Sequence, residues 1–325
     1  MEMTDSYGRK INYLRLSVTD RCNMRCLYCM PAEGIKLLGH DDILSYESLL
    51  VIARTAVSAG IEKIRITGGE PLVRKGIVPF LEKLARIPRL QQLVLTTNGL
   101  NLTDMAASLR QAGVQRLNIS LDSLKQETFA TITRGADLGQ VLAGIDAAER
   151  VGFPLKINMV VMRGINDAEI FDFVALTLKR PVTVRFIEYM PSLRNPGWES
   201  LVVPGGTILE RIGQRFSFSA EARDGLAGPA QTFRIEGAAG SFGIITPVTG
   251  HFCENCNRIR VTATGRVRGC LFSEAGLDLK PLLAADDHSA LAVALRAVIT
   301  CKPRRHSLDE ATQQYDSFAM AAVGG

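Results

Sequence analysis

The sequence predicts an α/β fold, a partial (βα)6 TIM-like barrel with a C-terminal extension. Short β-rich runs alternate with helical patterns six times between Tyr13 and Tyr189, which is typical of a parallel sheet with helices outside. Residues of chemical interest follow several of these runs, where a barrel of this type gathers its chemistry. The alternation fades from about Ile208, so we divide the chain into a barrel region, residues 1–207, and a C-terminal region, residues 208–325.

Six runs are expected as strands: Tyr13–Thr19, Lys63–Thr67, Leu93–Thr97, Arg116–Leu121, Leu155–Met162 and Val182–Tyr189. The helical patterns between them are Ser45–Ala59, Ile77–Arg86, Asp104–Gln111, Gln140–Val151 and Asp167–Leu178. Ser45 is suited to cap the first helix and Gly60 to end it. Beyond the barrel we expect a connection, a hairpin and a further helix at Ser192–Gly206, Gln231–Ile245 and Ser289–Ile299.

Composition indicates an ordinary globular protein, because hydrophobic residues make up 46% and charged residues 22% of the 325 positions. No apolar run approaches the ~20 residues that span a bilayer, and Met1–Lys10 does not resemble a signal peptide. We therefore expect a soluble, cytoplasmic protein. The net charge of +5 fits either non-specific nucleic-acid binding or a basic pocket for a small polyanion.

Six of the seven cysteines fall into two triplets. The first is Cys22, Cys26 and Cys29, in a loop that leaves the first strand. Three thiolates can bind three irons of a four-iron cluster and leave the fourth iron open to a substrate. Structural zinc with a distant fourth ligand is the alternative.

The second triplet is Cys253, Cys256 and Cys270. Structural zinc is again the alternative, with His251 or His306 as the fourth ligand. Four arginines accompany this triplet, at positions 258, 260, 266 and 268. Guanidinium groups pair with phosphate oxygens, which favours a polyanion over a solvated strand face. Cys301 fits no ligand position and is expected to be a small buried residue.

The first triplet, with Tyr28 before its last cysteine, and the run Thr67-Gly-Gly-Glu-Pro71 together resemble radical S-adenosylmethionine (SAM) enzymes. The resemblance implies a four-iron cluster on the first triplet, whose open iron is chelated by SAM. It also implies SAM contacts from Tyr28, Gly69, Ser120 and Met190. The glycines would let the backbone approach the methionine amino group.

Further motifs resemble the GTP 3′,8-cyclase family of molybdenum cofactor biosynthesis: Phe252–Arg260, Cys270-Leu-Phe272, Lys302-Pro303 with His306, and the terminal Gly324-Gly325. The resemblance implies a second four-iron cluster on Cys253, Cys256 and Cys270, whose open iron binds the guanine of GTP. The implied GTP contacts are Arg15, Arg65, Thr96, Lys156, Arg258, Ile259 and Arg260, and the implied catalytic residues are Arg258, Arg260, Gly324 and Gly325. Ala319–Val323 is smaller and less polar than the family's usual run before its glycines.

The activity implied is conversion of GTP to 3′,8-cyclo-7,8-dihydro-GTP, the first step of molybdopterin biosynthesis. The implied partners are an external one-electron donor and a downstream cyclic pyranopterin monophosphate synthase, and a homodimer is compatible with it. Neither nucleic acid nor a membrane is expected as a partner. Two alternatives stay open: a radical SAM peptide-modifying maturase, which usually has more auxiliary cysteines, and a zinc-stabilised nucleic-acid-binding protein.

Overall fold

A twelve-stranded sheet organises the structure, a computed structural model that describes residues 3–36, 38–193, 197–250, 252–273, 276–306 and 320–324. The strands run in the order β12-β11-β10-β1-β2-β3-β4-β5-β6-β9-β8-β7. Their bounds are β1 Tyr13–Ser17, β2 Lys63–Thr67, β3 Gln92–Thr97, β4 Arg116–Ser120, β5 Leu155–Val161, β6 Val182–Glu188, β7 Phe218–Ala220, β8 Gln231–Ile235, β9 Ser241–Ile245, β10 Arg258–Val261, β11 Arg266–Arg268 and β12 Gly276–Asp278.

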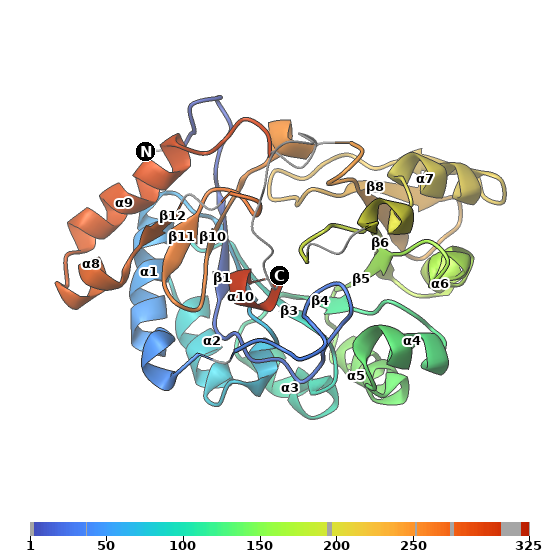
Figure 1. The fold of residues 1–325 in the computed structure, drawn as a ribbon, viewed down its shortest axis with the longest axis horizontal. Coiled ribbons are helices and arrows are strands. Elements are labelled where there is room, and N and C mark those ends of the chain that lie inside the picture. Colours follow the sequence, from blue (N-terminus) through green and yellow to red (C-terminus); the bar gives the residue numbers. More distant parts are fainter. Residues whose placement is uncertain are drawn as a thin grey trace.

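The α-helices lie mainly on the convex side of this sheet, which curves into an open arc (Figure 1). Their bounds are α1 Tyr46–Ala59, α2 Ile77–Ala85, α3 Leu102–Gln111, α4 Gln126–Thr133, α5 Leu138–Arg150, α6 Ile170–Lys179, α7 Gly205–Gly213, α8 Lys280–Ala284, α9 His288–Thr300 and α10 Met320–Val323. The short 3-10 helices are His40–Asp42, Pro71–Val73, Asp167–Glu169, Trp198–Leu201 and Phe252–Asn255.

Strands β1 to β6 form the predicted partial barrel. Each pairs in parallel with the next, and the sheet does not close. Every residue of β2 is buried, as expected for a parallel strand covered on both faces. The predicted cap of α1 is also confirmed, because the Ser45 hydroxyl accepts a hydrogen bond from the Ser48 amide and Gly60 ends the helix at φ 124°.

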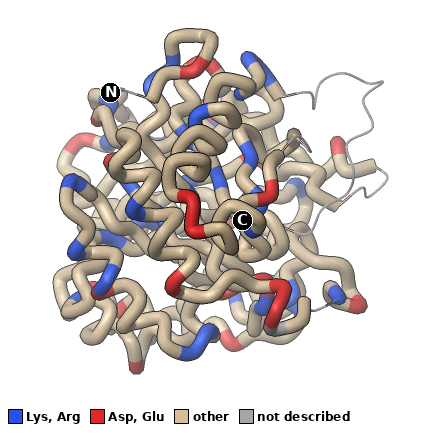
Figure 2. Tube along the Cα trace, turned by 90° about the vertical axis from the view of Figure 1, so that its left-hand side faces the viewer, with Lys and Arg blue, Asp and Glu red and all other residues tan. Residues whose placement is uncertain are grey.

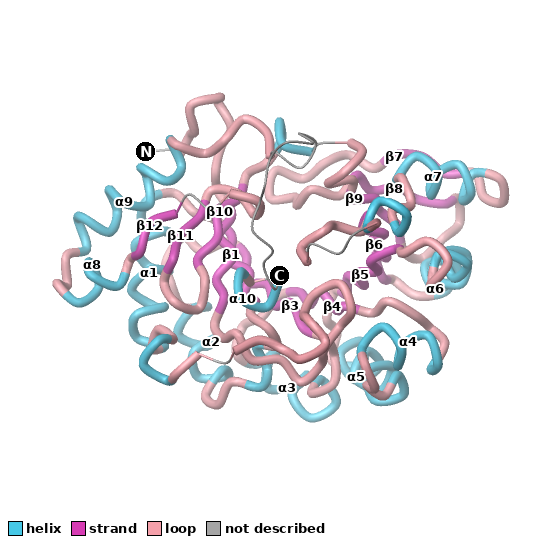
Figure 3. The backbone as a smooth tube through the Cα atoms, in the orientation of Figure 1, coloured by secondary structure: helices cyan, strands magenta, loops and turns pink. Residues whose placement is uncertain are grey.

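The C-terminal region extends both edges of the barrel sheet. Strand β10 pairs in parallel with β1, so that Arg258 and Arg260 lie beside Tyr13 and Arg15. Strand β9 pairs in parallel with β6 and forms the predicted hairpin with β8. Figure 3 shows the result as one continuous arc of strands around the C-terminal residues. Strand β10, which follows Cys253 and Cys256, therefore lies next to β1, which precedes the first triplet.

The structure adds four α-helices to those expected, α4, α7, α8 and α10. Helix α4 follows β4 without a strong apolar repeat, and α7 begins with Gly205-Gly206, two poor helix formers. The expectation of a buried Cys301 was wrong. This cysteine is exposed, because it is the C-cap that follows the last turn of α9. No helix in the described ranges is long and apolar enough to cross a membrane.

Close packing of α5 against the loop after β3 predicts a strong effect of a single methyl group. A Cβ at Gly144 would lie 2.5 Å from the Gly99 carbonyl oxygen, whereas one at the exposed helical Gly206 would meet nothing within 4 Å. Gly144→Ala should therefore lower the free energy of unfolding by about 1–3 kcal/mol. Gly206→Ala should leave it unchanged or raise it slightly. Urea unfolding of the metal-free chain measures both, and equal effects would contradict this packing.

Candidate functional site

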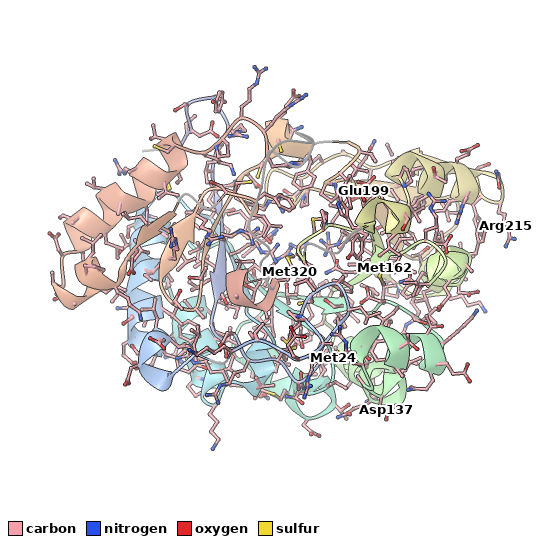
Figure 4. All side chains as sticks on the ribbon, in the orientation of Figure 1. Met24, Asp137, Met162, Glu199, Arg215 and Met320 are labelled. Atoms are coloured by element: carbon pink, nitrogen blue, oxygen red, sulfur yellow. The ribbon has the colours of Figure 1, made fainter. Side chains whose placement is uncertain are left out.

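Two adjoining cavities lie inside the arc of strands. One is lined by the first cysteine triplet and has a volume of about 130 Å³, and the other is lined by the second triplet and has a volume of about 220 Å³. Four residues line both cavities: Tyr28, Thr96, Ser120 and Met320. Figure 4 shows Met320 within the arc, above Met24 of the first cysteine loop. The two cavities therefore share one wall, formed by these four residues.

The first triplet forms a half-buried group of cysteines, two of which accept hydrogen bonds from N–H donors. The Met24 amide lies 3.4 Å and the Asn98 amide nitrogen 3.9 Å from Cys22 Sγ, and the Ala321 amide hydrogen-bonds Cys29. Burial raises the pKa of all three thiols, that of Cys29 to about 12. Converging thiols with N–H···S bonds are the donor set that an iron–sulfur cluster requires. Cluster binding would stabilise the ionised form that burial alone disfavours.

Gly68 and Gly69 lie directly against the segment that leads into the first cysteine loop. A Cβ on Gly68 would lie 2.7 Å from the Thr19 carbonyl oxygen, and one on Gly69 would overlap the Arg21 carbonyl oxygen. The Gly69 amide also donates to the Thr19 carbonyl at 2.8 Å. These glycines therefore have a packing role that the sequence alone did not suggest.

Two buried carboxylates fix the edge of this cavity. Glu70 accepts hydrogen bonds from Thr97 Oγ1 at 2.8 Å and from the Asn98 amide at 2.6 Å, which joins the ends of β2 and β3. Asp122 accepts from Tyr28 Oη and from the Val160 amide, both at 2.8 Å. Burial raises the pKa of Glu70 to about 7 and of Asp122 to about 6. Asp122 thereby ties the cysteine loop to β5.

The second triplet lies in positive surroundings. Its thiols are close enough to influence one another electrostatically. The His306 amide donates to Cys253, and the Arg258 guanidinium lies 3.8 Å from Cys256 Sγ. Although burial opposes ionisation of Cys256, the charges of Arg258 and Lys302 lower the pKa of its thiol to about 6. A thiol of this kind is ready to bind metal as thiolate.

A buried basic cluster occupies the barrel interior. Arg65 and Lys156 were predicted, whereas Lys63, Arg116 and Arg185 were missed. Burial and the neighbouring positive charges lower the pKa of Lys63 to about 6, of Lys156 to about 7 and of Arg185 to about 9. Charged residues inside parallel strands that are otherwise apolar were the available signal. Figure 2 shows basic segments near the C-terminal end of the trace in that view.

Several buried polar atoms in this interior have no hydrogen-bond partner. They include Nε of Arg65, Nε of Arg185, Oγ1 of Thr96 and Oδ1 of Asn158, and all four residues line the larger cavity. Unpaired buried polar atoms are costly unless a ligand satisfies them. The cavity therefore suits a ligand that carries several negative charges and hydrogen-bonding groups.

The structure brings most of the predicted residues to these cavities. Gly69 lines the smaller one, and the larger one is lined by Arg15, Arg65, Met190, Arg258, Ile259 and Arg260. Lys156 lines neither cavity and lies beside Arg185 and Arg116. Arg266 and Arg268 lie on β11 and line neither cavity. His251 and Gly325 are outside the described residues.

The C-terminal helix α10 contacts both triplet regions. The Met320 amide donates to the Cys29 carbonyl at 3.0 Å, and Arg260 donates to the Val323 carbonyl at 3.4 Å. Gly324 has φ +76°, and a Cβ there would lie 2.8 Å from Thr67 Oγ1. A side chain at this position would be both strained and crowded.

Comparison with known proteins defines the class. Residues 16–177 match the Radical SAM superfamily, and residues 182–308 match Molybdenum Cofactor Synthesis C. The fold is similar to the crystal structure of Streptococcus suis SuiB bound to S-adenosylmethionine, with a TM-score of 0.61, 14% identity and coverage of 90% of this chain and 69% of that chain. The chain is a radical SAM enzyme, a class that uses an iron–sulfur cluster and SAM.

Curated relatives identify the family within that class. The GTP 3′,8-cyclase of Geobacter sulfurreducens is 60% identical over 326 residues, which cover 100% of both chains. The GTP 3′,8-cyclase of Moorella thermoacetica is 44% identical, with 99% of this chain and 100% of that protein covered. This chain belongs to the GTP 3′,8-cyclase family.

The packing of Gly69 predicts how a methyl group there would affect the first site. Gly69→Ala should displace the first cysteine loop and abolish reductive SAM cleavage, because the new Cβ overlaps the Arg21 carbonyl. Gly228→Ala, where a Cβ meets nothing within 4 Å, is the matched control. Formation of 5′-deoxyadenosine under dithionite measures the effect. A Gly69→Ala chain that cleaves SAM at the wild-type rate would show that the loop tolerates the change.

Proposed function

We propose that this chain converts GTP to 3′,8-cyclo-7,8-dihydro-GTP with two four-iron clusters, one on each cysteine triplet. The observation that carries the proposal is the pair of adjoining cavities, each lined by three thiols and both lined by Tyr28, Thr96, Ser120 and Met320. A group activated in one cavity can reach a substrate in the other without passing through solvent. The relatives' name supplies the reaction.

The first triplet would hold the cluster that binds SAM. Cys22, Cys26 and Cys29 are the only thiols that line the smaller cavity among the described residues, so a fourth iron there has no cysteine ligand. Gly69 and Ser120 would contact SAM from the ends of β2 and β4, and Tyr28 and Met190 from the loops after β1 and β6. When bound, the reduced cluster and SAM supply a 5′-deoxyadenosyl radical and methionine.

The second triplet would hold the cluster that binds the guanine of GTP. Arg258, Ile259 and Arg260 lie on β10 next to this triplet and would hold the substrate close to it. Arg65 and Arg185, which line the larger cavity, would hold the triphosphate. The neighbouring Lys156, Lys63 and Arg116, which line neither cavity, would bind it more weakly through their charges, since a polyanion relieves the repulsion among these cations. Arg15 and Thr96 would contact GTP between these two groups.

The residues then direct one internal rearrangement of GTP. The ribose would be held toward the wall shared by the two cavities, where its 3′ hydrogen atom would pass to the 5′-deoxyadenosyl radical and give 5′-deoxyadenosine. The C3′ carbon would then bond to C8 of guanine, and one electron from the external donor and one proton would complete a product that is an isomer of GTP. Tyr28, Ser120 and Met320 exclude water from this wall. Arg258, Arg260, Gly324 and Gly325 would assist ring closure, because Arg260 donates to the carbonyl of Val323, the residue before Gly324.

We also propose the wider setting that the family implies. Residues 1–207 would form the radical SAM partial barrel and residues 208–325 would carry the substrate cluster, although the strands of both regions share one sheet. An external one-electron donor and a downstream cyclic pyranopterin monophosphate synthase would be the partners, in the cytoplasm.

An activity assay tests the proposed reaction. The chain is reconstituted with iron and sulfide without oxygen and incubated with dithionite, SAM and GTP. Mass spectrometry should find the cyclised isomer, and its absence with intact clusters would refute the proposal.

The two triplets should separate in iron content and in function. The wild-type chain should hold about eight irons after anaerobic reconstitution, and Cys26→Ala or Cys256→Ala should each hold about four. Cys26→Ala should lose SAM cleavage, whereas Cys256→Ala should retain some cleavage and lose cyclisation. Iron, sulfide and zinc analysis with product assays measures this. Stoichiometric zinc on the second triplet would contradict it and favour the structural-zinc alternative.

GTP binding should take up protons at pH 8. The pKa of Lys63 is lowered to about 6 and that of Lys156 to about 7, so both amines are largely neutral before binding. Triphosphate favours their charged forms, so the chain should take up about one proton per lysine. Calorimetry in buffers of different ionisation enthalpy measures the uptake. Lys156→Met should reduce it by about one proton, and an unchanged uptake would remove Lys156 from the phosphate site.

A further inference from the structure

The three cysteines of the second triplet lie on two backbone segments. Cys253 and Cys256 lie on one turn, in which the Cys256 amide donates to the Cys253 carbonyl at 3.1 Å, and Cys270 follows β11. The antiparallel pairing of β10 with β11 joins the two segments, but its paired residues lie beyond the cysteines. Contacts beside the cysteines therefore add to what the strand pairing fixes before metal binds.

Arg9 is bonded to the first of these segments. Its guanidinium donates to the Cys253 carbonyl at 2.7 Å and to the Pro303 and Arg304 carbonyls at 2.8 and 3.2 Å. Its Nε donates to the Asp5 carboxylate, and both side chains are almost fully buried. All three guanidinium nitrogens therefore donate to groups of this chain, unlike Arg65 and Arg185 in the same cavity, whose Nε atoms have no partner.

Asp5 holds Arg9 in this position through a tight N-terminal turn. Asp5 Oδ1 accepts from the amides of Tyr7 and Arg9 at 2.9 and 3.0 Å. The Gly8 amide donates to the Asp5 carbonyl at 3.1 Å, with Gly8 at φ 78°. The Asp5 carboxylate thus both orders this turn and orients the Arg9 guanidinium.

Lys302 is bonded beside both segments. Its buried ammonium donates to the Arg258 carbonyl at 3.0 Å and to the Gly269 carbonyl, and it lies close to the Cys256 thiol. Gly269 immediately precedes Cys270. Because Pro303 and Arg304 follow Lys302 directly and accept from Arg9, the two cations form one connected hydrogen-bonded unit.

We infer that Arg9 and Lys302 are positioning residues that hold the two segments of the second triplet together. The inference rests on the proposed second cluster. Arg9 joins the turn of Cys253 and Cys256 to the chain next to Lys302, while Lys302 joins the start of β10 to the residue before Cys270. Residues that orient metal ligands through hydrogen bonds typically change metal retention about 10- to 100-fold when they are replaced. Losing them should therefore release iron from the second site and leave the first site intact.

The test measures iron release to a chelator in two single-site chains. A Cys26→Ala chain should carry iron only on the second triplet, and a Cys256→Ala chain only on the first. Arg9→Gln or Lys302→Met should speed release about 10- to 100-fold in the first chain and leave it unchanged in the second. Arg9→Lys should give a smaller effect, because an ammonium can replace only part of the guanidinium contacts.

The matched control is Arg234→Gln. Arg234 also pairs with a carboxylate, Glu221, and donates to two carbonyls, those of Ala238 and Gly240, but lies on β8 away from the triplet. It should leave iron release unchanged. If neither Arg9→Gln nor Lys302→Met speeds release from the second site, or if both sites are affected equally, the inference is wrong. A Cys26→Ala chain that holds no iron at all refutes instead the proposed second cluster.

Discussion

The parallel pairing of β10 with β1 is the contact on which the site depends. It places Arg258 beside Tyr13 and Arg260 beside Arg15, so that a strand from the C-terminal region completes the wall of the barrel. The first triplet follows β1, whereas Cys256 precedes β10 and Cys270 follows the antiparallel β11, so the two triplets lie at opposite ends of the paired strands and line cavities inside the same arc. An appended domain on a flexible linker would not hold two reactive centres in such fixed relation.

That arrangement brings many positively charged side chains together in the barrel interior. Arginine and lysine side chains from β1, β2, β4, β5, β6 and β10 lie close to one another, and removal from water, together with their mutual repulsion, lowers several of their pKa values. Such an interior is unfavourable when empty of anions. Binding a polyanionic substrate relieves this repulsion. The strands that form the core therefore also carry the basic residues that favour binding of the triphosphate.

The barrel could be predicted because its strands and helices are local patterns in the sequence. The cysteine triplets could be found because the spacing of cysteines is visible in the sequence itself. The pairing of β9 and β10 with the barrel could not be predicted, because it joins residues more than 50 positions apart in the sequence. Lys63, Arg116 and Arg185 were missed because one sequence does not tell which face of a strand is enclosed. The packing role of Gly69 and the exposure of Cys301 likewise depend on tertiary contacts.

The proposed reaction requires the radical formed beside the first triplet to react directly with a substrate held at the second. Deuterium at C3′ of GTP tests it most directly. After reaction with SAM and dithionite, the 5′-deoxyadenosine should contain deuterium from GTP, because the wall of Tyr28, Thr96, Ser120 and Met320 is common to both cavities. Cyclised product accompanied by unlabelled 5′-deoxyadenosine would contradict the account.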